Sequence, residues 1–185
     1  MKYCSHCAQP VELRIPEGDT HTRHVCPSCG TIHYHNPKLV VGCVPEHDGG
    51  ILLCRRAIEP RLGYWTIPAG FMENGESLQA AAVRESYEEA LARVEIGSLL
   101  AVVSVVHAHQ VHVMFRARLP VAEFAPGTES LEVELVRPED IPWREIAFPS
   151  IEFALRRYLE DRARGTEGVH FTDFDRPGWH RATPS

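Results

Sequence analysis

The stretch from Gly70 to Ala92, GFMENGESLQAAAVRESYEEALA, constrains the fold of this chain more than any other. It begins as a loop punctuated by glycine. From Ser77, a residue type that commonly caps helix N-termini, it continues as good helix formers with no Gly or Pro before Gly97. The sequence therefore predicts a helix that begins just after Ser77.

Three glutamates lie on one face of this predicted helix. Glu85, Glu88 and Glu89 are spaced i, i+3 and i+4, so their side chains project within a single turn. Carboxylate oxygens gathered in this way suit a hard divalent cation such as Mg²⁺; a solvated acidic face is the alternative. We expect the opposite face to be buried, and it carries Ala80, Val83, Tyr87, Ala90 and Leu91.

The order of fixed residues in this stretch resembles the Nudix box of hydrolases that cleave a nucleoside diphosphate linked to another group. Gly70 is followed by five residues, Glu76, seven residues, Arg84-Glu85, two residues and Glu88-Glu89. The segments NPKLVVGCVPE, LLCRRAIEPRLGYW, FAPGTESLE and AFPS extend the resemblance to zinc-ribbon Nudix hydrolases that act on ADP-ribose or FAD. The resemblance implies an α/β fold, the Nudix α/β/α sandwich with a mixed sheet.

The end of the box departs from the usual pattern. Ser86 stands where the family usually has an apolar residue, and Leu91-Ala92 stands where it usually has a helix-ending glycine and an apolar residue. These departures concern the C-terminal end of the helix and its packing, while the acidic positions are kept.

Two pairs of cysteines precede this region. Cys4 and Cys7 are followed, after eighteen residues, by Cys26 and Cys29, so the pattern is C-x2-C twice. Such spacing is typical of a structural Zn²⁺ site in a small zinc ribbon, and a pair of disulfides is the alternative. Four thiolates would complete the coordination of the metal, so we expect a structural role and not a catalytic one.

The rest of the chain alternates short apolar runs with turns. Residues 39–45 and 51–56 predict a hairpin, and residues 94–106, 111–119 and 133–136 predict further strands. Residues 150–164 predict an amphipathic helix that covers the sheet. We therefore divide the chain into a zinc ribbon (1–36), a Nudix domain (37–164) and an irregular C-terminal tail (165–185) whose Phe171, Phe174 and Trp179 could dock on the body or on a partner chain.

The resemblance also implies roles for individual residues. The Gly70 carbonyl with Glu85, Glu88 and Glu89 would hold Mg²⁺ or Mn²⁺ against the diphosphate. Arg84 can reach Glu88 at i+4 and hold its rotamer. A glutamate from the FAPGTESLE loop would activate the water, which leaves Glu129 and Glu132 as candidates.

Four other residues are candidates for substrate binding. Arg55 and Arg56 could meet a diphosphate, because a planar guanidinium matches phosphate oxygens, although a surface position suits them equally. Tyr64 could stack on a base, whereas we expect Trp65 in the core. Glu76 is grouped with them as the residue that orders the box loop. His107, His109 and His112 are expected to contact substrate or solvent; on an extended strand only His107 and His109 share a face.

The substrate has several candidates. ADP-ribose or FAD follows from the resemblance, although the proline that marks many ADP-ribose hydrolases after the box is replaced by His107-Ala108. NAD(H) pyrophosphatases also carry a zinc ribbon, but their SQPWPF-type stretch is absent from GSLLAVVSVVHAHQVHVMF. A nucleotide sensor without catalysis is a third alternative.

Charge and hydropathy limit the partners. The formal net charge of −6 disfavours general nucleic-acid binding, which needs a basic surface. No apolar run approaches the roughly 20 residues of a membrane span, and MKYCSHCAQP is not a signal peptide. We expect a cytoplasmic enzyme acting on a small nucleotide, and the resemblance implies a homodimer.

Overall fold

The computed structural model describes residues 1–175, so the predicted contact of Trp179 lies outside the described residues. The chain divides into two compact units, which meet in sequence between Pro37 and Lys38. Across the described part of the chain, no helix combines the length and the apolar character needed to cross a membrane.

The N-terminal unit is a three-stranded antiparallel sheet of very short strands, β1 (Glu12–Arg14), β2 (Arg23–Val25) and β3 (Ile32–His33). Its interior is small: its buried apolar side chains are Cys4, Pro16, Val25 and Cys26. A segment with so little buried surface needs a cross-link or a metal for stability.

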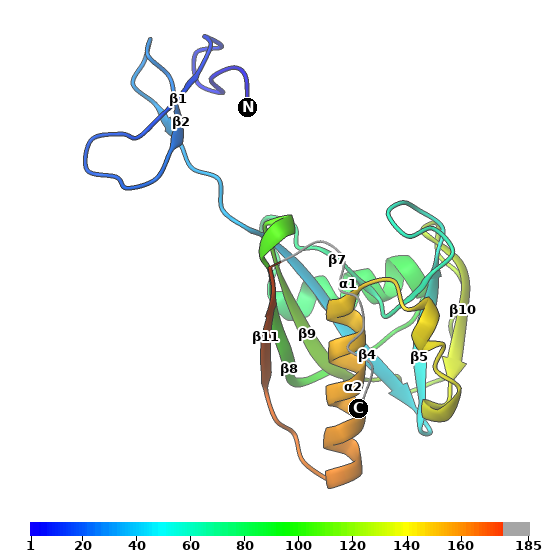
Figure 1. The fold of residues 1–185 in the computed structure, drawn as a ribbon. Coiled ribbons are helices and arrows are strands. Elements are labelled where there is room, and N and C mark those ends of the chain that lie inside the picture. Colours follow the sequence, from blue (N-terminus) through cyan, green and yellow to red (C-terminus); the bar gives the residue numbers. More distant parts are fainter. Residues whose placement is uncertain (176–185) are drawn as a thin grey trace. The chain divides into compact units, whose positions relative to one another are not determined.

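The second unit is built on an eight-stranded mixed sheet in the order β10-β5-β4-β9-β8-β11, with β6 paired to β5 and β7 to β4 (Figure 1). Strands β4 and β9 are parallel, as are β8 and β11. The strands are β4 (Lys38–His47), β5 (Gly50–Arg56), β6 (Trp65–Thr66), β7 (Ala69–Phe71), β8 (Glu95–Val105), β9 (Gln110–Arg118), β10 (Ser130–Val136) and β11 (His170–Phe174). The helices are α1 (Leu78–Ala90) and α2 (Pro149–Arg164), with single turns η1 (Val106–Ala108), η2 (Pro138–Asp140) and η3 (Trp143–Glu145).

Side-chain alternation along β5 shows which helix covers which face. Ile51 and Leu53 belong to the apolar cluster that contains Leu155 of α2. Their neighbours Leu52 and Cys54 pack with Ala90 of α1. Successive residues of a strand point to opposite faces, so the two helices cover opposite faces of the sheet, as Figure 1 shows. This is the expected α/β/α sandwich, and Trp65 lies in its core as predicted.

The predicted buried face of α1 was wrong except at Ala90, which is fully buried. Val83, Tyr87 and Leu91 are 40%, 48% and 43% exposed. The buried side chains of α1 are Ala81, Ala82, Glu85, Ser86, Glu89 and Ala90. A face of small residues lets the helix approach β4 and β7 closely, and two of the carboxylates are buried together with it.

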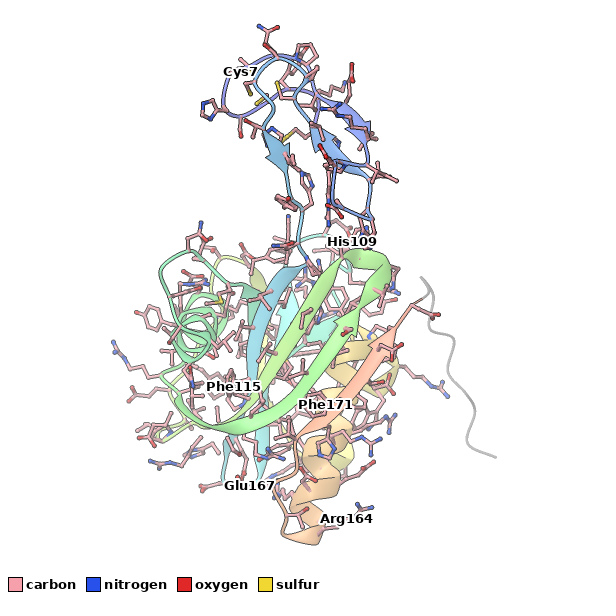
Figure 2. The ribbon with its side chains drawn as sticks, turned by 90° about the vertical axis from the view of Figure 1, so that its left-hand side faces the viewer. Cys7, His109, Phe115, Arg164, Glu167 and Phe171 are labelled. Carbon is pink, nitrogen blue, oxygen red and sulfur yellow. The ribbon has the colours of Figure 1, made fainter. Side chains whose placement is uncertain are left out.

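The tail was predicted to be irregular, and this was also wrong for its first part. Residues His170–Phe174 form β11, which pairs in parallel with β8 from His170↔Ala101 to Phe174↔Val105. In Figure 2, Arg164 marks the end of α2, Glu167 the connection that follows, and Phe171 the strand β11 beside β8. The open edge of β8 supplies backbone hydrogen bonds that the composition of the tail does not predict.

Candidate active site

Gly70 and Glu85 are in direct contact. A Cβ atom added to Gly70 would lie 2.4 Å from the carboxyl carbon of Glu85 and 2.4 Å from each of its oxygens. Gly70 lies on β7, which pairs with β4 through Val41, and Glu85 faces it from α1. Only glycine leaves room for the carboxylate at this point of the strand.

Arg84 organises the carboxylates around it. Its guanidinium donates two hydrogen bonds to Glu76, at 2.8 and 3.1 Å. The Nη1 atom donates to Glu85 at 2.7 Å and to Glu88 at 2.8 Å, and Nη2 donates to the carbonyl oxygen of Phe71 at 3.0 Å. These hydrogen bonds lower the pKa of Glu76 to about 2. The expected Arg84–Glu88 contact is present, as part of a larger network that connects the box loop to the helix.

Glu89 is the most deeply buried carboxylate of the group. It is 6% exposed, and its Oε2 accepts a hydrogen bond from the backbone N–H of Ala69 at 3.2 Å. Burial raises the pKa of Glu89 to about 8; the charge of Glu85 adds to the rise, while the Ala69 N–H and the Arg56 guanidinium oppose it. Burial also raises the pKa of Glu85. A cation beside these side chains would favour their charged form.

The loop before β10 packs on the last turn of α1. The N–H of Ala125 donates to the Ala90 carbonyl at 2.9 Å, and the N–H of Gly127 donates to the Glu89 carbonyl at 3.0 Å. A Cβ on Gly127 would lie 1.7 Å from the carbonyl oxygen of Glu88. This contact holds the loop that presents Glu129. Our sequence reasoning missed Gly127, although a glycine next to Pro126 in FAPGTESLE was the available signal.

A cleft of about 1010 Å³ connects these elements. Glu132, Arg55, Tyr64 and Glu76 are not among the residues that line it. The candidates that do line it are Arg56, Gly70, Arg84, Glu85, Glu88, Glu89 and Glu129.

Arg55 and Arg56 point to opposite faces of the sheet, because side chains alternate along β5. The Nε atom of Arg56 donates to the Pro60 carbonyl at 2.9 Å, and its guanidinium lies 5.2 Å from the ring centre of Phe148 in the cleft wall. Arg55 instead forms an ion pair with Glu132 at 3.4 Å. Of these two arginines, Arg56 is the one that lines the cleft, where it can face an anion.

The donor set of the cleft fits a hard divalent cation. Six glutamates and three arginines of the described chain line it, and four of the glutamates are the candidate site residues Glu85, Glu88, Glu89 and Glu129. Burial raises the pKa of Glu85 and of Glu89. Arg84 already occupies oxygens of Glu85 and Glu88, so a bound cation would have to share or displace that guanidinium. Oxygen ligands of this kind are those that Mg²⁺ and Mn²⁺ accept.

Among the described residues, the four cysteines form a group that could hold a metal ion. Their sulfur atoms lie within 4.8 Å of one another. The Sγ–Sγ distances are 3.7 Å for Cys4–Cys29, 3.5 Å for Cys7–Cys26 and 3.5 Å for Cys7–Cys29. A disulfide needs about 2.05 Å, whereas a tetrahedron with Zn–S bonds of about 2.3 Å has sulfurs about 3.8 Å apart. The cluster fits zinc.

The histidines are arranged differently from the expectation. His107 and His112 line the cleft, while His109 does not. The turn η1 at residues 106–108 interrupts the extended geometry on which our face assignment depended, so that assignment was wrong. His112 is buried, its Nε2 lies 2.9 Å from Oε1 of Gln110, and its Nδ1 has no hydrogen-bond partner among the described residues.

The departures at the end of the box have local explanations. Leu91 takes the left-handed conformation at the helix terminus, with φ of 48°, in the place of the usual glycine. Ser86 is fully buried, and its hydroxyl donates to the Ala82 carbonyl at 2.8 Å. The helix therefore ends at Ala90, as it would with a glycine at position 91. Because Leu91 has a side chain, its left-handed backbone conformation is strained.

Each of the two units matches a known protein family. Residues 36–157 match the family described as "NUDIX domain", and residues 2–35 match the family described as "Nudix N-terminal", a zinc ribbon. A crystal structure of a Nudix hydrolase from Nitrosomonas europaea superposes with a TM-score of 0.90 at 53% identity, covering 94% of this chain and 100% of that one.

Two curated relatives carry different activities in their names. An ADP-ribose pyrophosphatase of Methanocaldococcus jannaschii is 31% identical over 59% of this chain and 67% of its own length. A NAD-capped RNA hydrolase, NudC, of Chromobacterium violaceum is 34% identical over 51% of this chain. The aligned part spans only 34% of that NudC protein.

Proposed function

This chain belongs to the Nudix family of hydrolases, and on that premise we propose that it hydrolyses the diphosphate bond of a nucleoside diphosphate derivative, with ADP-ribose or FAD as the first candidates. The observation that carries the proposal is the contact of Glu85 with Gly70 at the floor of a cleft lined by Glu88, Glu89 and Glu129. The M. jannaschii relative supports ADP-ribose.

The residues of the proposed site have different roles. Gly70, Glu85, Glu88 and Glu89 would hold Mg²⁺ or Mn²⁺, which when bound neutralises the charge that grows on the phosphate oxygens. Arg84 positions Glu85 and Glu88. Arg56 lines the cleft and would face the anionic substrate.

We assign the base to Glu129 in preference to Glu132. The carboxylate of Glu129 lines the cleft and its charge raises the pKa of Glu85 and of Glu89, so it is near both. Glu132 pairs with Arg55 and does not line the cleft. In this role Glu129 takes the proton of the attacking water as the water adds to phosphorus and the other phosphate leaves.

NAD(H), free or as an RNA cap, is the second candidate, because several relatives are named NAD-capped RNA hydrolases. The panel that separates the candidates contains ADP-ribose, FAD, NADH, an NAD-capped RNA oligonucleotide, diadenosine polyphosphates and nucleoside triphosphates. Each is incubated with Mg²⁺ or Mn²⁺, and products are quantified by phosphate release after phosphatase coupling.

We expect ADP-ribose or FAD to have the highest kcat/KM, EDTA to abolish turnover, and Glu129→Gln to reduce kcat far more than Glu132→Gln. Turnover confined to NADH or the capped RNA would favour the second candidate. Binding of a nucleotide with no turnover of any compound would favour a sensor. Light scattering on the same preparation tests the expected homodimer.

A further inference from the structure

The cleft has two chemically different parts. One part contains the glutamates and arginines described above. The other part is formed by three separate segments, and among the described residues that they contribute to the lining none is acidic and none is a lysine or an arginine. These segments are the turn between β8 and β9 (Val105, His107, Ala108, Gln110, His112), the start of α2 (residues 147–151) and the end of β11 (Phe174). An uncharged part of a substrate suits this environment better than a phosphate does.

Gln110 and His112 bring two neighbouring polar side chains to this second part. Gln110 begins β9 directly after His109, which Figure 2 labels at the turn between β8 and β9. Residues two apart on a strand point to the same face, so the side chains of Gln110 and His112 lie together. Val111 and Val113 alternate with them and pack on the α1 side of the sheet. Gln110 and His112 therefore face the α2 side.

The surroundings of the His112 ring determine its tautomer. The ring is buried, and its Nδ1 atom has no hydrogen-bond partner among the described residues. A buried N–H without a partner is rarer in proteins than a buried acceptor without one, so the single proton of the neutral ring belongs on Nε2. Burial lowers the pKa of His112 to about 4, which keeps the ring uncharged at neutral pH.

This tautomer in turn determines the orientation of the Gln110 amide. The Nε2 atom of His112 lies 2.9 Å from Oε1 of Gln110, and an N–H at this point needs the amide oxygen and not the amide nitrogen as its partner. The NH2 group is then the part of the amide left for the cleft, and it has no acceptor within the part of the chain that the structure describes. The half-buried Gln110 thus holds two N–H donors in place before a ligand arrives.

We propose that Gln110 is a specificity-determining residue of the cleft, whose amide NH2 donates to a neutral acceptor on the heterocycle of the substrate while the diphosphate meets the glutamates. His112 is the positioning residue that holds the amide in this orientation. The inference rests on the proposed hydrolysis of a nucleoside diphosphate derivative. The heterocycles of the candidate substrates carry such acceptors, which are the ring nitrogens of adenine and the carbonyl oxygens of flavin and nicotinamide.

One substitution and one matched control test the contact. Gln110→Met keeps the length of the side chain and removes both donors. Gln79→Met makes the same change at an exposed glutamine of α1 that does not line the cleft. Full-length proteins are compared by circular dichroism and melting temperature. Binding of AMP, FMN, nicotinamide mononucleotide and ribose 5-phosphate is measured by calorimetry, which requires no turnover, and kinetics are measured on the best substrate of the panel.

We expect Gln110→Met to raise KM, and the Kd of the mononucleotide that contacts it, by about three- to tenfold, which is the contribution of one neutral hydrogen bond. The kcat should change less than about twofold, because the diphosphate still meets the glutamates. Ribose 5-phosphate lacks a heterocycle and should bind both proteins alike, and Gln79→Met should resemble the wild type. An analogue of that mononucleotide without the contacted acceptor should bind the wild type more weakly but should lose nothing further in Gln110→Met.

The role of His112 is tested through Gln110. His112→Met removes the N–H that orients the amide, whereas His112→Gln retains a donor. We expect His112→Met to raise the Kd about threefold, because the amide is no longer held in place, and to have no further effect in Gln110→Met. His112→Gln should restore the wild-type Kd.

Unchanged KM and Kd in Gln110→Met would overturn the proposal, as would an equal loss of ribose 5-phosphate binding. An effect of His112→Met that is equally large with and without Gln110 would overturn the positioning role. If the wild type hydrolyses none of the panel but binds a mononucleotide through Gln110, the contact stands and the proposed hydrolysis fails. Hydrolysis with a KM that does not depend on Gln110 is the reverse result.

Discussion

The two helices that cover the sheet differ in the apolar side chains that they bury and in what their buried carboxylates contact. On α2, Ile151, Leu155 and Tyr158 face the sheet and form the larger apolar cluster. On α1, Glu85 and Glu89 are buried beside alanines, while Val83 and Tyr87 face outward. Burial of a carboxylate costs free energy unless it is paired. On α2 the buried Glu152 and Asp161 each pair with an arginine, whereas the buried carboxylates of α1 line the cleft.

The carboxylates of α1 are held partly by groups outside that helix. Its carboxylates are held by Arg84, by the N–H of Ala69 and by the space above Gly70. On α2 the buried Glu152 has a simpler partner, Arg156 on the same helix, at 2.7 Å. A buried glutamate on α2 thus completes a local ion pair, whereas those on α1 face a cleft.

The sharpest test compares buried glutamates on the two helices. Glu89→Gln keeps the shape of the side chain but removes its charge, and we expect kcat/KM to fall at least about 100-fold because charge stabilisation at the reacting phosphate is lost. Glu152→Gln is the control and should leave kcat/KM within about twofold. Steady-state hydrolysis of the best substrate measures both, and similar values for the two variants would break the contrast.

The second test compares apolar residues. Leu155→Ala opens a cavity in the α2 cluster, so we expect the free energy of unfolding to fall by about 2–5 kcal/mol. Val83→Ala on α1 removes a side chain that is 40% exposed, and should cost under about 1 kcal/mol. Denaturant unfolding measures both; equal costs would mean that α1 packs as α2 does.

The third test uses His112, a buried polar side chain on β9 and not on either helix. Burial lowers the pKa of His112 from 6.5 to about 4. As the pH falls through about 6.5, the unfolded ring takes up a proton that the folded ring refuses until about pH 4, so stability present above pH 6.5 is lost across this range. We expect about 2 kcal/mol of the loss between pH 7 and pH 5 to come from His112.

Denaturant unfolding at pH 7 and pH 5 measures this loss for the wild type and for His112→Gln. The difference between the two proteins isolates the contribution of the ring from that of other groups. A wild-type loss no larger than that of the variant would show that the ring accepts its proton in the folded protein.

The smallest effect concerns the end of α1. Leu91 has a φ of 48°, a conformation that costs a residue with a Cβ atom about 1 kcal/mol and glycine much less. Leu91→Gly should therefore raise the free energy of unfolding by about 0.5–1 kcal/mol. Leu91→Ala retains the Cβ atom and should give no gain, so a gain shared by both variants would assign the effect to the lost side chain and not to the backbone.

Local patterns predicted the elements well and their partners less well. Ser77 caps α1 as expected, since its hydroxyl accepts a hydrogen bond from the N–H of Ala80 at 3.1 Å. The hairpin of β4 and β5 and the helix α2 also occur where their patterns indicated. Capping and periodicity act over a few residues, and such signals are written directly in the sequence.

Two of the features that the sequence did not predict are contacts between distant segments. The strand β11 exists because the edge of β8 was open, and its paired residues lie 69 positions earlier in the chain. Gly127 matters because the carbonyl of Glu88 lies against it. Neither contact can be read from a periodic pattern, because the segments that meet are far apart in the sequence.

From its sequence alone this chain could be recognised as a zinc ribbon followed by a Nudix domain, since thiolate spacing and the order of acids along one helix are short-range properties. Which face of α1 is buried, which of two arginines and which of two loop glutamates line the cleft, and that Phe174 joins them, were decided only by the tertiary structure. The reason is geometric: alternation along a strand places neighbours on opposite sides, and only the packing of the sheet determines which side becomes a cleft.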